Sequence, residues 1–264
     1  MLYIVGTPIG NLKDITQRAV EVLKEVDFIA CEDTRHSGIL LNLLGIKKPL
    51  ISYYKQKEKE SGEKIISLLE EGKNVALISD AGMPCISDPG SVVVTMAREK
   101  GLDISVVPGP SAMISAFALS GLSGGFVFIG FLAEKNKDRD IQLHPFIDSP
   151  LPLVFYCGPH DVNKYIAYLY EKLGNRPLYA IKEITKIYEN TEISTLEKGL
   201  CGEIRGEYVL IIGGAKQTNS LLDLSAEEHL KYYLDLGLDK KNAIKKVASE
   251  RGVNKDVIYK LALK

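Results

Sequence analysis

The 264-residue chain contains no tryptophan, few cysteines and no apolar run near the about 20 residues that a membrane-spanning helix needs. Its four cysteines, Cys31, Cys85, Cys157 and Cys201, show no CxxC spacing. That scatter argues against a structural zinc site and against a disulfide framework. We therefore expect no metal, no membrane partner and a reducing, cytoplasmic location.

An excess of one charge is also missing, because 33 Lys and Arg residues stand against 34 Asp and Glu residues, for a net charge of −1. A protein that holds a bare nucleic-acid duplex usually shows a basic excess. Any nucleic-acid role must then rely on local patches. Two are visible, a strip of Lys135, Lys137 and Arg139 and a Lys-rich tail after Leu224. Both are equally typical of an ordinary solvated face.

Three common site motifs are absent or misplaced. No G-x-x-x-x-G-K-[ST] occurs, which excludes a P-loop. Residues 6–10 (GTPIG) lack G-x-G-x-x-G, and Pro8 removes an N–H that a pyrophosphate would need. Residues 121–125 match G-x-S-x-G, but they follow a predicted helix instead of a strand, so a hydrolase nucleophile is excluded.

The first half of the chain alternates short apolar runs with amphipathic segments. Such alternation predicts a parallel, doubly wound α/β sheet. The expected strands are residues 2–5, 28–31, 50–53, 75–79 and 104–107. We place helices at 15–26, 39–44, 55–71, 92–101 and 112–119.

A Gly-rich joint at 121–125 leads into a second set of strands. These are expected at 126–132, 153–156, 178–181 and 209–213, with a helix at 162–173 and a hairpin arm at 184–194. The tail is expected to be helical, with Gly252 between two short helices in a helix-turn-helix-like arrangement. The predicted domains are 1–115, 116–222 and 223–264.

Four loops rich in Gly and Pro follow four strands of the predicted parallel sheet. They span residues 6–11, 32–35, 80–90 and 108–112. Because βα loops of a parallel sheet gather at its carboxyl edge, they predict a ligand crevice there. The longest, SDAGMPCISDPG after the apolar run 75–78, combines two Pro and two Gly with Asp80 and Asp88. The alternative is that these loops are ordinary βα connections that bind no ligand.

Six segments together resemble the class III, tetrapyrrole-methylase-like S-adenosylmethionine methyltransferases. They are VGTPIGNLKDIT (5–16), EDTR (32–35), ALISDAGMPCISDPG (76–90), VVPGPSA (106–112), FIGFL (128–132) and RGEYVLIIGG (205–214). The resemblance covers essentially the whole chain and is strongest to the members that methylate the 2′-hydroxyl of a cytidine in 16S rRNA. It implies an N-terminal parallel sheet, a C-terminal mixed sheet, a helical appendage, a homodimer and 16S rRNA of the small ribosomal subunit as partner.

The resemblance also implies a cofactor site for S-adenosyl-L-methionine between the two domains. Its expected residues are Pro8, Ala81, Gly82, Met83, Ile86, Ser111, Ala112, Tyr156, Cys157, Gly158 and Thr185. A sulfonium is a cation with apolar flanks, so a nearby carboxylate suits it, Asp80 before Asp88. Turn capping is the alternative role for both aspartates.

Methyl transfer to a ribose hydroxyl needs alignment and gains from a base, because the hydroxyl is a weak nucleophile. Glu32, Asp33 and Arg35 end a predicted strand at the cofactor edge, so they are the expected catalytic residues. A structural cluster of capping and ion pairing is the alternative.

The chain departs from the family pattern at Ala133, where Pro is usual, and in two longer segments. Lys55-Gln56-Lys57-Glu58 stands where Glu-His-Asn-Glu is usual, and Cys157–Asp161 where Glu-Ser-Pro-His-Arg is usual. The exact target nucleotide is therefore open. Two other functions are also open: the same chemistry on a small molecule or a protein side chain, and a non-enzymatic binding protein. Residues 184–193 are the candidate dimer interface.

Overall fold

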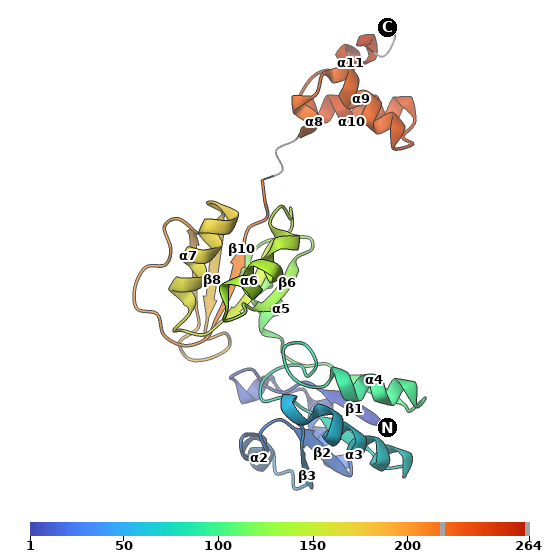
Figure 1. Cartoon of the computed structure of the whole chain (residues 1–264), viewed down its shortest axis with the longest axis vertical. Coiled ribbons are helices and arrows are strands. Elements are labelled where there is room, and N and C mark those ends of the chain that lie inside the picture. The colour runs from blue at the N-terminus through green and yellow to red at the C-terminus, as the bar shows by residue number, and fades with distance from the viewer. Residues whose placement is uncertain (217–219, 262–264) are drawn as a thin grey trace. The chain divides into compact units, whose positions relative to one another are not determined.

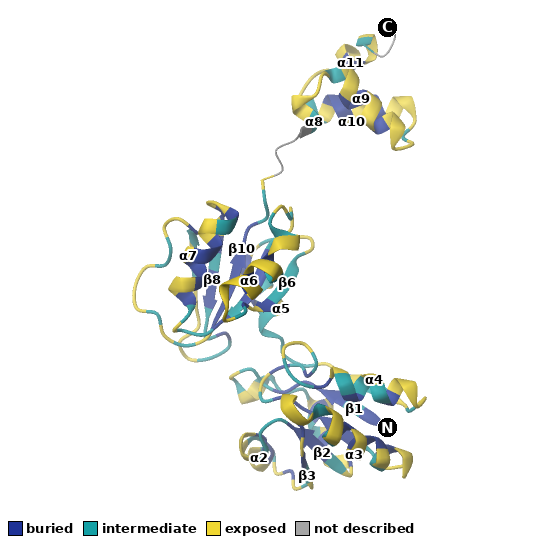
Figure 2. Cartoon of the chain, in the orientation of Figure 1, coloured by how far each residue is buried: buried dark blue, intermediate teal, exposed yellow. Residues whose placement is uncertain are grey.

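The computed structural model describes residues 1–216 and 220–261, which belong to two compact units, Met1–Ala215 and Lys216–Lys264 (Figure 1). Each unit has its own set of buried apolar side chains (Figure 2). In the described part of the chain, no helix is long and apolar enough to cross a membrane.

The first sheet contains five parallel strands in the order β3-β2-β4-β1-β5. They are β1 (Leu2–Val5), β2 (Phe28–Cys31), β3 (Leu50–Ser52), β4 (Val75–Leu77) and β5 (Ile104–Val107). Alternate side chains of the central strands enter two separate cores, so β4 is buried on both faces. This confirms the prediction of a doubly wound sheet, whose strands must be apolar on both sides.

Amphipathic helices cover both faces of this sheet. α1 (Gln17–Glu25) and α2 (Thr34–Leu43) supply one core, while α3 (Glu58–Glu70) and α4 (Ser91–Glu99) supply the other. Two 3₁₀ turns, Leu12–Asp14 and Lys55–Lys57, precede α1 and α3. The sequence placed the start of α2 at residue 39, but the helix begins five residues earlier because the Asp33 side chain caps its first turn.

The second sheet also has five strands, in the order β6-β7-β10-β8-β9. They are β6 (Val127–Phe131), β7 (Leu153–Cys157), β8 (Pro177–Lys182), β9 (Asn190–Thr195) and β10 (Tyr208–Ile212). Only β6 and β7 pair in parallel, so the sheet is mixed, as expected. Of the predicted hairpin arm, residues 190–194 lie in β9, and residues 183–189 form the connection from β8.

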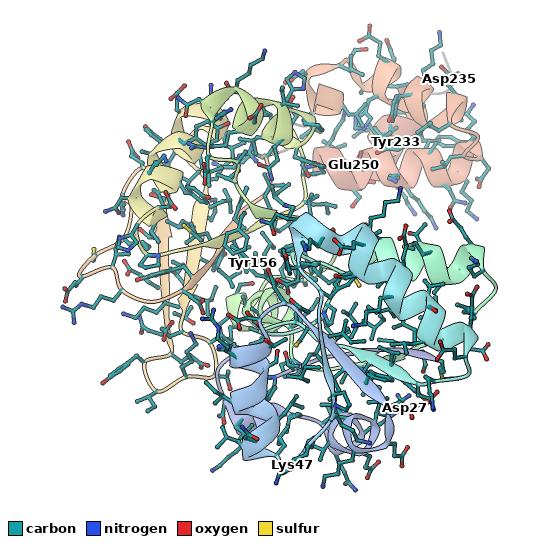
Figure 3. The ribbon with its side chains drawn as sticks, turned by 60° about the horizontal axis from the view of Figure 1, so that its bottom comes forward. Asp27, Lys47, Tyr156, Tyr233, Asp235 and Glu250 are labelled. Carbon is teal, nitrogen blue, oxygen red and sulfur yellow. The ribbon has the colours of Figure 1, made fainter. Side chains whose placement is uncertain are left out.

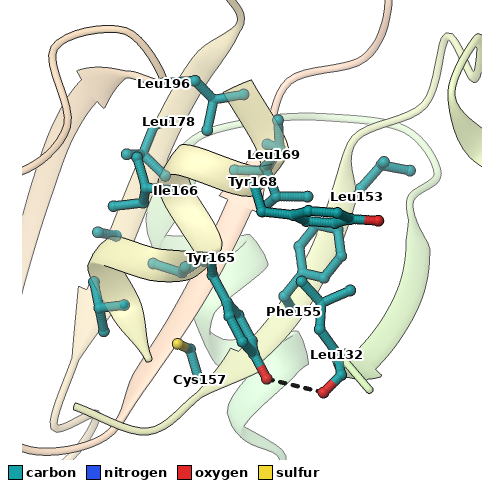
Figure 4. Packing of buried hydrophobic residues seen from close by; sticks show 14 of the residues in the cluster. Leu132, Leu153, Phe155, Cys157, Tyr165, Ile166, Tyr168, Leu169, Leu178 and Leu196 are labelled. Carbon is teal, nitrogen blue, oxygen red and sulfur yellow. Dashed lines mark hydrogen bonds between the residues drawn. The ribbon is translucent and has the colours of Figure 1, made fainter. Parts of the chain in front are cut away.

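The two faces of the second sheet carry different helices. α6 (Asn136–Leu143), a 3₁₀ turn (His144–Phe146) and α7 (Val162–Leu173) pack on one face, where Tyr165 donates a hydrogen bond to the Leu132 carbonyl at 3.0 Å (Figure 4). α5 (Ala112–Ser120) packs on the other face, so the predicted boundary after residue 115 falls inside a helix. The sequence did not predict α6.

The unit Lys216–Lys264 is helical in its described part. It contains α8 (Ser220–Asp223), α9 (Ala226–Asp235), α10 (Lys240–Arg251) and α11 (Lys255–Leu261). Gly252 ends α10 in the left-handed conformation, which is the predicted helix–turn–helix connection. Buried His229 lies beside Glu250. Glu250 also accepts from the Tyr233 hydroxyl, and both of these residues are labelled in Figure 3. This small core is therefore joined by polar contacts as well as apolar ones.

Candidate active site

A cavity of about 380 Å³ lies within the larger unit. Ligand pockets commonly measure about 300–1,000 Å³. One side, which we call the first wall, consists of loops of the first sheet: Ile9, Glu32, Asp80, Ala81, Gly82, Met83, Ile86, Ser87, Asp88, Ser111 and Ala112. The second wall comes from the second sheet: Phe131, Tyr156, Cys157, Gly158, Ile181, Glu183, Ile184, Lys186, Glu207, Tyr208 and Val209.

Backbone contacts tie the loops of the first wall to one another. The Thr7 N–H donates to the Gly82 carbonyl at 2.9 Å, and the Gly82 N–H donates to the Thr7 carbonyl at 3.2 Å. The fully buried Thr7 hydroxyl also donates to the Ser79 carbonyl at 3.1 Å. Gly6 and Gly109 pack so closely that a Cβ on Gly6 would lie 2.7 Å from the Gly109 Cα. The loops after β1, β4 and β5 therefore form one rigid surface.

The far end of the 80–90 loop is held by Glu58 at the start of α3. Glu58 Oε1 accepts from the Gly90 N–H at 2.9 Å and from the Tyr53 hydroxyl at 3.2 Å. The Tyr53 oxygen in turn accepts from the Val93 N–H at 3.2 Å. Burial raises the pKa of Tyr53 well above its usual range, so its hydroxyl stays a donor. Glu58 is thus a clamp on the loop, in a segment where the family pattern differs.

Three carboxylates of the first wall meet in the cavity. Burial, followed by the charges of Asp80 and Asp88, raises the pKa of Glu32. Burial also raises the pKa of Asp88, against the lowering effect of a hydrogen bond from Ser79. Asp80 has a buried Oδ1 with no hydrogen-bond partner among the described residues. The cluster therefore favours a bound cation or a transferred proton.

Of the three expected catalytic residues, only Glu32 lines the cavity. Asp33 Oδ1 accepts from the backbone N–H of Arg35 at 2.8 Å, and Asp33 Oδ2 from its guanidinium at 2.9 Å. These side-chain and backbone hydrogen bonds from Arg35 lower the pKa of Asp33 to about 2. The Arg35 side chain is 90% exposed. The contacts of Asp33 and Arg35 are therefore those of the alternative role, helix capping and ion pairing.

Most of the expected cofactor residues lie together in the cavity: Asp80, Ala81, Gly82, Met83, Ile86, Ser111, Ala112, Tyr156, Cys157 and Gly158. Pro8 and Thr185 are not among its lining residues. Thr185 instead donates from its hydroxyl to Asp14 Oδ2, which links the β8–β9 connection to the turn before α1. The individual roles stay predictions, but the residues do share one site.

The sequence missed most of the second wall. Glu183, Ile184, Lys186 and residues 207–209 line the cavity, yet none of them was an expected site residue, although 207–209 lie in the segment 205–214 that contributes to the family resemblance. Lys186 Nζ lies 3.0 Å from Glu183 Oε1 and 2.8 Å from Glu207 Oε2. Burial acts to lower the pKa of Lys186, but the hydrogen bonds to Glu207 and Glu183 raise it overall. The second wall is therefore held by side-chain ion pairs.

The basic strip at 135–139 needs a correction. Arg139 is only 2% exposed and donates to the carbonyls of Ala133 and Glu134, both at 2.7 Å. Its guanidinium lies 5.2 Å from the centre of the Tyr168 ring. Arg139 therefore stabilises its own loop and is closed to phosphates, whereas Lys135 and Lys137 are exposed.

The Lys-rich tail needs a similar correction at one position. Arg251 donates from Nε to His229 Nδ1 at 3.1 Å and from Nη2 to the Leu221 carbonyl at 3.0 Å. The Arg251 guanidinium is therefore hydrogen-bonded inside the smaller unit. The lysines of α10 and α11 are exposed: Lys240, Lys241, Lys245, Lys246, Lys255 and Lys260.

The chain is similar to proteins of known family. Residues 1–198 match the family described as Tetrapyrrole (Corrin/Porphyrin) Methylases. The chain is 40% identical to ribosomal RNA small subunit methyltransferase I of Halalkalibacterium halodurans, over 98% of this chain and 93% of that protein. It is also 40% identical to the Escherichia coli O157:H7 protein of the same name, over 99% and 94%.

Solved structures share the fold at lower identity. Diphthine synthase matches with a TM-score of 0.59 at 15% identity, over 81% of this chain and 89% of that one. Uroporphyrin-III C-methyl transferase from Thermus thermophilus, complexed with S-adenyl homocysteine, matches with a TM-score of 0.57 at 23% identity, over 80% and 96%. These likenesses establish the architecture.

Proposed function

The chain belongs to the tetrapyrrole methylase family and, within it, to the ribosomal RNA small subunit methyltransferases I, and from that premise we propose its reaction. It transfers a methyl group from S-adenosyl-L-methionine to the 2′-hydroxyl of a cytidine in 16S rRNA. The observation that carries this proposal is one cavity that joins the expected cofactor residues to Glu32.

The residues present fit the cofactor. The cavity offers the unpartnered Asp80 carboxylate oxygen for a cation, and apolar contacts from Met83 and Ile86 for its flanks. Ala81, Gly82, Ser111 and Ala112 would hold it from the first wall, and Tyr156, Cys157 and Gly158 from the second. Pro8 and Thr185 would act from outside the lining, by fixing neighbouring backbone. When bound, the cofactor supplies a methyl group on a sulfonium, whose carbon–sulfur bond breaks as the new carbon–oxygen bond forms.

Glu32 acts as the general base in this proposal. It accepts the proton of the ribose hydroxyl as that oxygen attacks, and releases the proton to water afterwards. Its raised pKa brings the carboxylate closer to neutral pH, where proton acceptance is most effective. Asp33 and Arg35 support the reaction from the rim: Asp33 holds the exposed guanidinium of Arg35, which contacts an RNA phosphate.

The RNA is bound by further basic side chains outside the cavity. Lys135 and Lys137 on the larger unit, and the exposed lysines of α10 and α11, contact phosphates. We also propose a homodimer in the cytoplasm, with the β8–β9 connection at the interface, because Ile187 is 93% and Tyr188 75% exposed there.

Mapping of ribose methylation tests this function directly. Depletion of the protein should remove one 2′-O-methylcytidine from 16S rRNA, and restored expression should return it. Unchanged ribose methylation across 16S rRNA after complete depletion would contradict the proposal. A methylated small molecule or protein side chain lost in its place would support the same chemistry on another substrate.

A further inference from the structure

An exposed aromatic ring stands in the second wall. Phe131, the last residue of β6, lines the cavity although its side chain is 58% exposed. Its ring lies 5.5 Å from that of Tyr156 at 61°, and Tyr156 lies 5.0 Å from Phe128 at 69°. Two half-buried rings thus support a third ring that remains open to solvent. An exposed ring beside a cavity is typical of a surface that a ligand covers.

An irregularity in β6 turns Phe131 toward the cavity. Val127 pairs with Leu153 and Phe128 with Val154, but the pairing then shifts, so that Gly130 faces Phe155 and Phe131 faces Tyr156. Leu153 and Phe155 belong to the core beneath α7, whereas Val154 and Tyr156 lie on the α5 side. Strict alternation would send Phe131 to the α7 core with Val127 and Ile129. The extra residue sends it to the Tyr156 side instead.

The backbone at this bulge is specialised as well. Gly130 has φ +76°, which a side-chain-bearing residue rarely adopts. A Cβ at Gly130 would lie 3.6 Å from Ser87 Oγ, so the bulge stands close to the 80–90 loop. Ile86 on that loop is 51% exposed and also lines the cavity. The cavity thus presents an open aromatic face and an apolar side chain, while the carboxylates of Glu32, Asp80 and Asp88 lie on the first wall.

The proposed substrate has a part that such a surface fits. A nucleotide that enters a cavity to bring its ribose 2′-hydroxyl to a methyl donor leaves the stack of its neighbours, as single-stranded RNA readily allows. The unstacked base then needs a new partner, and an aromatic side chain offers one. The other end of the nucleotide, the ribose, belongs near Glu32.

We propose that Phe131, supported by Tyr156, is the platform on which the base of the target nucleotide stacks during methyl transfer. This inference rests on the proposed function and deepens it, because it assigns the base subsite to the second wall. Ile86 contacts the base from the 80–90 loop. Since stacking accepts any base, Phe131 supplies affinity and positioning, and polar contacts select cytosine.

Steady-state kinetics on small ribosomal subunits that lack the methyl group test the proposal, with Phe131→Leu and Phe131→Tyr as variants. Base–aromatic stacking corresponds to about 5- to 150-fold in affinity. Phe131→Leu should raise the KM for the subunit within that range, and Phe131→Tyr should stay near the unaltered protein. The Kd for S-adenosyl-L-methionine, measured by calorimetry, should be unchanged in both.

Ile39→Ala is the matched control, because Ile39 is 62% exposed but does not line the cavity. It should leave KM unchanged, and all three variants should keep the thermal midpoint. Unaltered kinetics in Phe131→Leu would overturn the platform. So would an equal loss of cofactor affinity, which would mean that the ring covers the cofactor. If the unaltered protein itself methylates no ribosomal RNA, the proposed function fails and this inference with it.

Discussion

The two walls of the cavity are built in different ways. The first wall consists of βα loops at the carboxyl edge of a parallel sheet, joined by backbone hydrogen bonds such as those between Thr7 and Gly82. The second wall consists of strand residues and the β8–β9 connection of a mixed sheet, held by the ion pairs of Lys186. Backbone contacts survive most substitutions, whereas side-chain contacts do not. The geometry of the first wall therefore depends less on individual side chains than that of the second wall.

Glu32→Gln should have the largest effect on the first wall. A general base contributes about 10²- to 10⁴-fold to the rate, so kcat should fall by that factor while cofactor affinity is kept. In the unaltered protein, kcat should fall as the pH drops through the raised pKa of Glu32, because the protonated carboxyl accepts no proton. Rapid-quench methylation assays across pH measure both effects.

Asp33→Asn is the control for Glu32→Gln, because Asp33 lies next to it outside the cavity. Because asparagine also caps helix N-termini, stability should change little, and the loss of kcat should be much smaller than in Glu32→Gln. An equal loss of kcat in the two variants would contradict the assignment of Glu32 as the general base.

The clamp on the 80–90 loop should give the next largest effect. Glu58→Ala leaves the Gly90 N–H and the Tyr53 hydroxyl without their acceptor, which should cost about 1–3 kcal/mol in unfolding free energy and weaken cofactor binding. Glu58→Gln keeps an acceptor oxygen and should lose less. Urea unfolding and cofactor titration separate the two variants; if they behave alike, the clamp is not what holds the loop.

Lys186→Met tests the second wall in the same terms. The Lys186 side chain is 28% exposed, and a partly exposed ion pair contributes about 0–1 kcal/mol. The stability loss should therefore be smaller than for Glu58→Ala. The pKa of Glu183, lowered by the Glu207 backbone N–H and then by Lys186, should move back toward its usual value. A stability loss greater than that of Glu58→Ala would reverse the contrast between the walls.

Arg35→Ala should have the smallest effect. Its exposed guanidinium touches only Asp33 among the described residues, so stability should hardly change. Loss of one phosphate contact should reduce the slope of log affinity against log salt by about 1. Filter binding to the small subunit at several salt concentrations measures this slope, and an unchanged slope would exclude the phosphate contact.

The sequence predicted the first wall because parallel sheets obey a general rule. Strands such as 2–5 and 75–77 are apolar on both faces, and their loops must meet at one edge. The same rule does not put Asp33 and Arg35 in the cavity lining, since a strand end does not reveal whether a side chain turns to the cavity or caps the next helix.

No comparable rule predicts from the sequence which residues line the second wall. Phe131 reaches the cavity through a bulge, and a single glycine among apolar residues does not predict one. Lys186 lies in the β8–β9 connection, where Glu183 and Thr185 have positive φ that their residue types do not indicate. Arg139 stands in a charged strip of the sequence, which cannot show that two aromatic rings and two carbonyls enclose its guanidinium. Tertiary packing decided each of these positions.

One measurement tests the central claim, that a single cavity brings cofactor and ribose together. Purified protein, S-adenosyl-L-methionine labelled in its methyl group and small subunits from depleted cells are incubated, and the digested RNA is analysed by mass spectrometry. The account predicts one labelled 2′-O-methylcytidine per 16S rRNA with the unaltered protein and almost none with Glu32→Gln. Label on a base, or equal ribose labelling by both proteins, would contradict it.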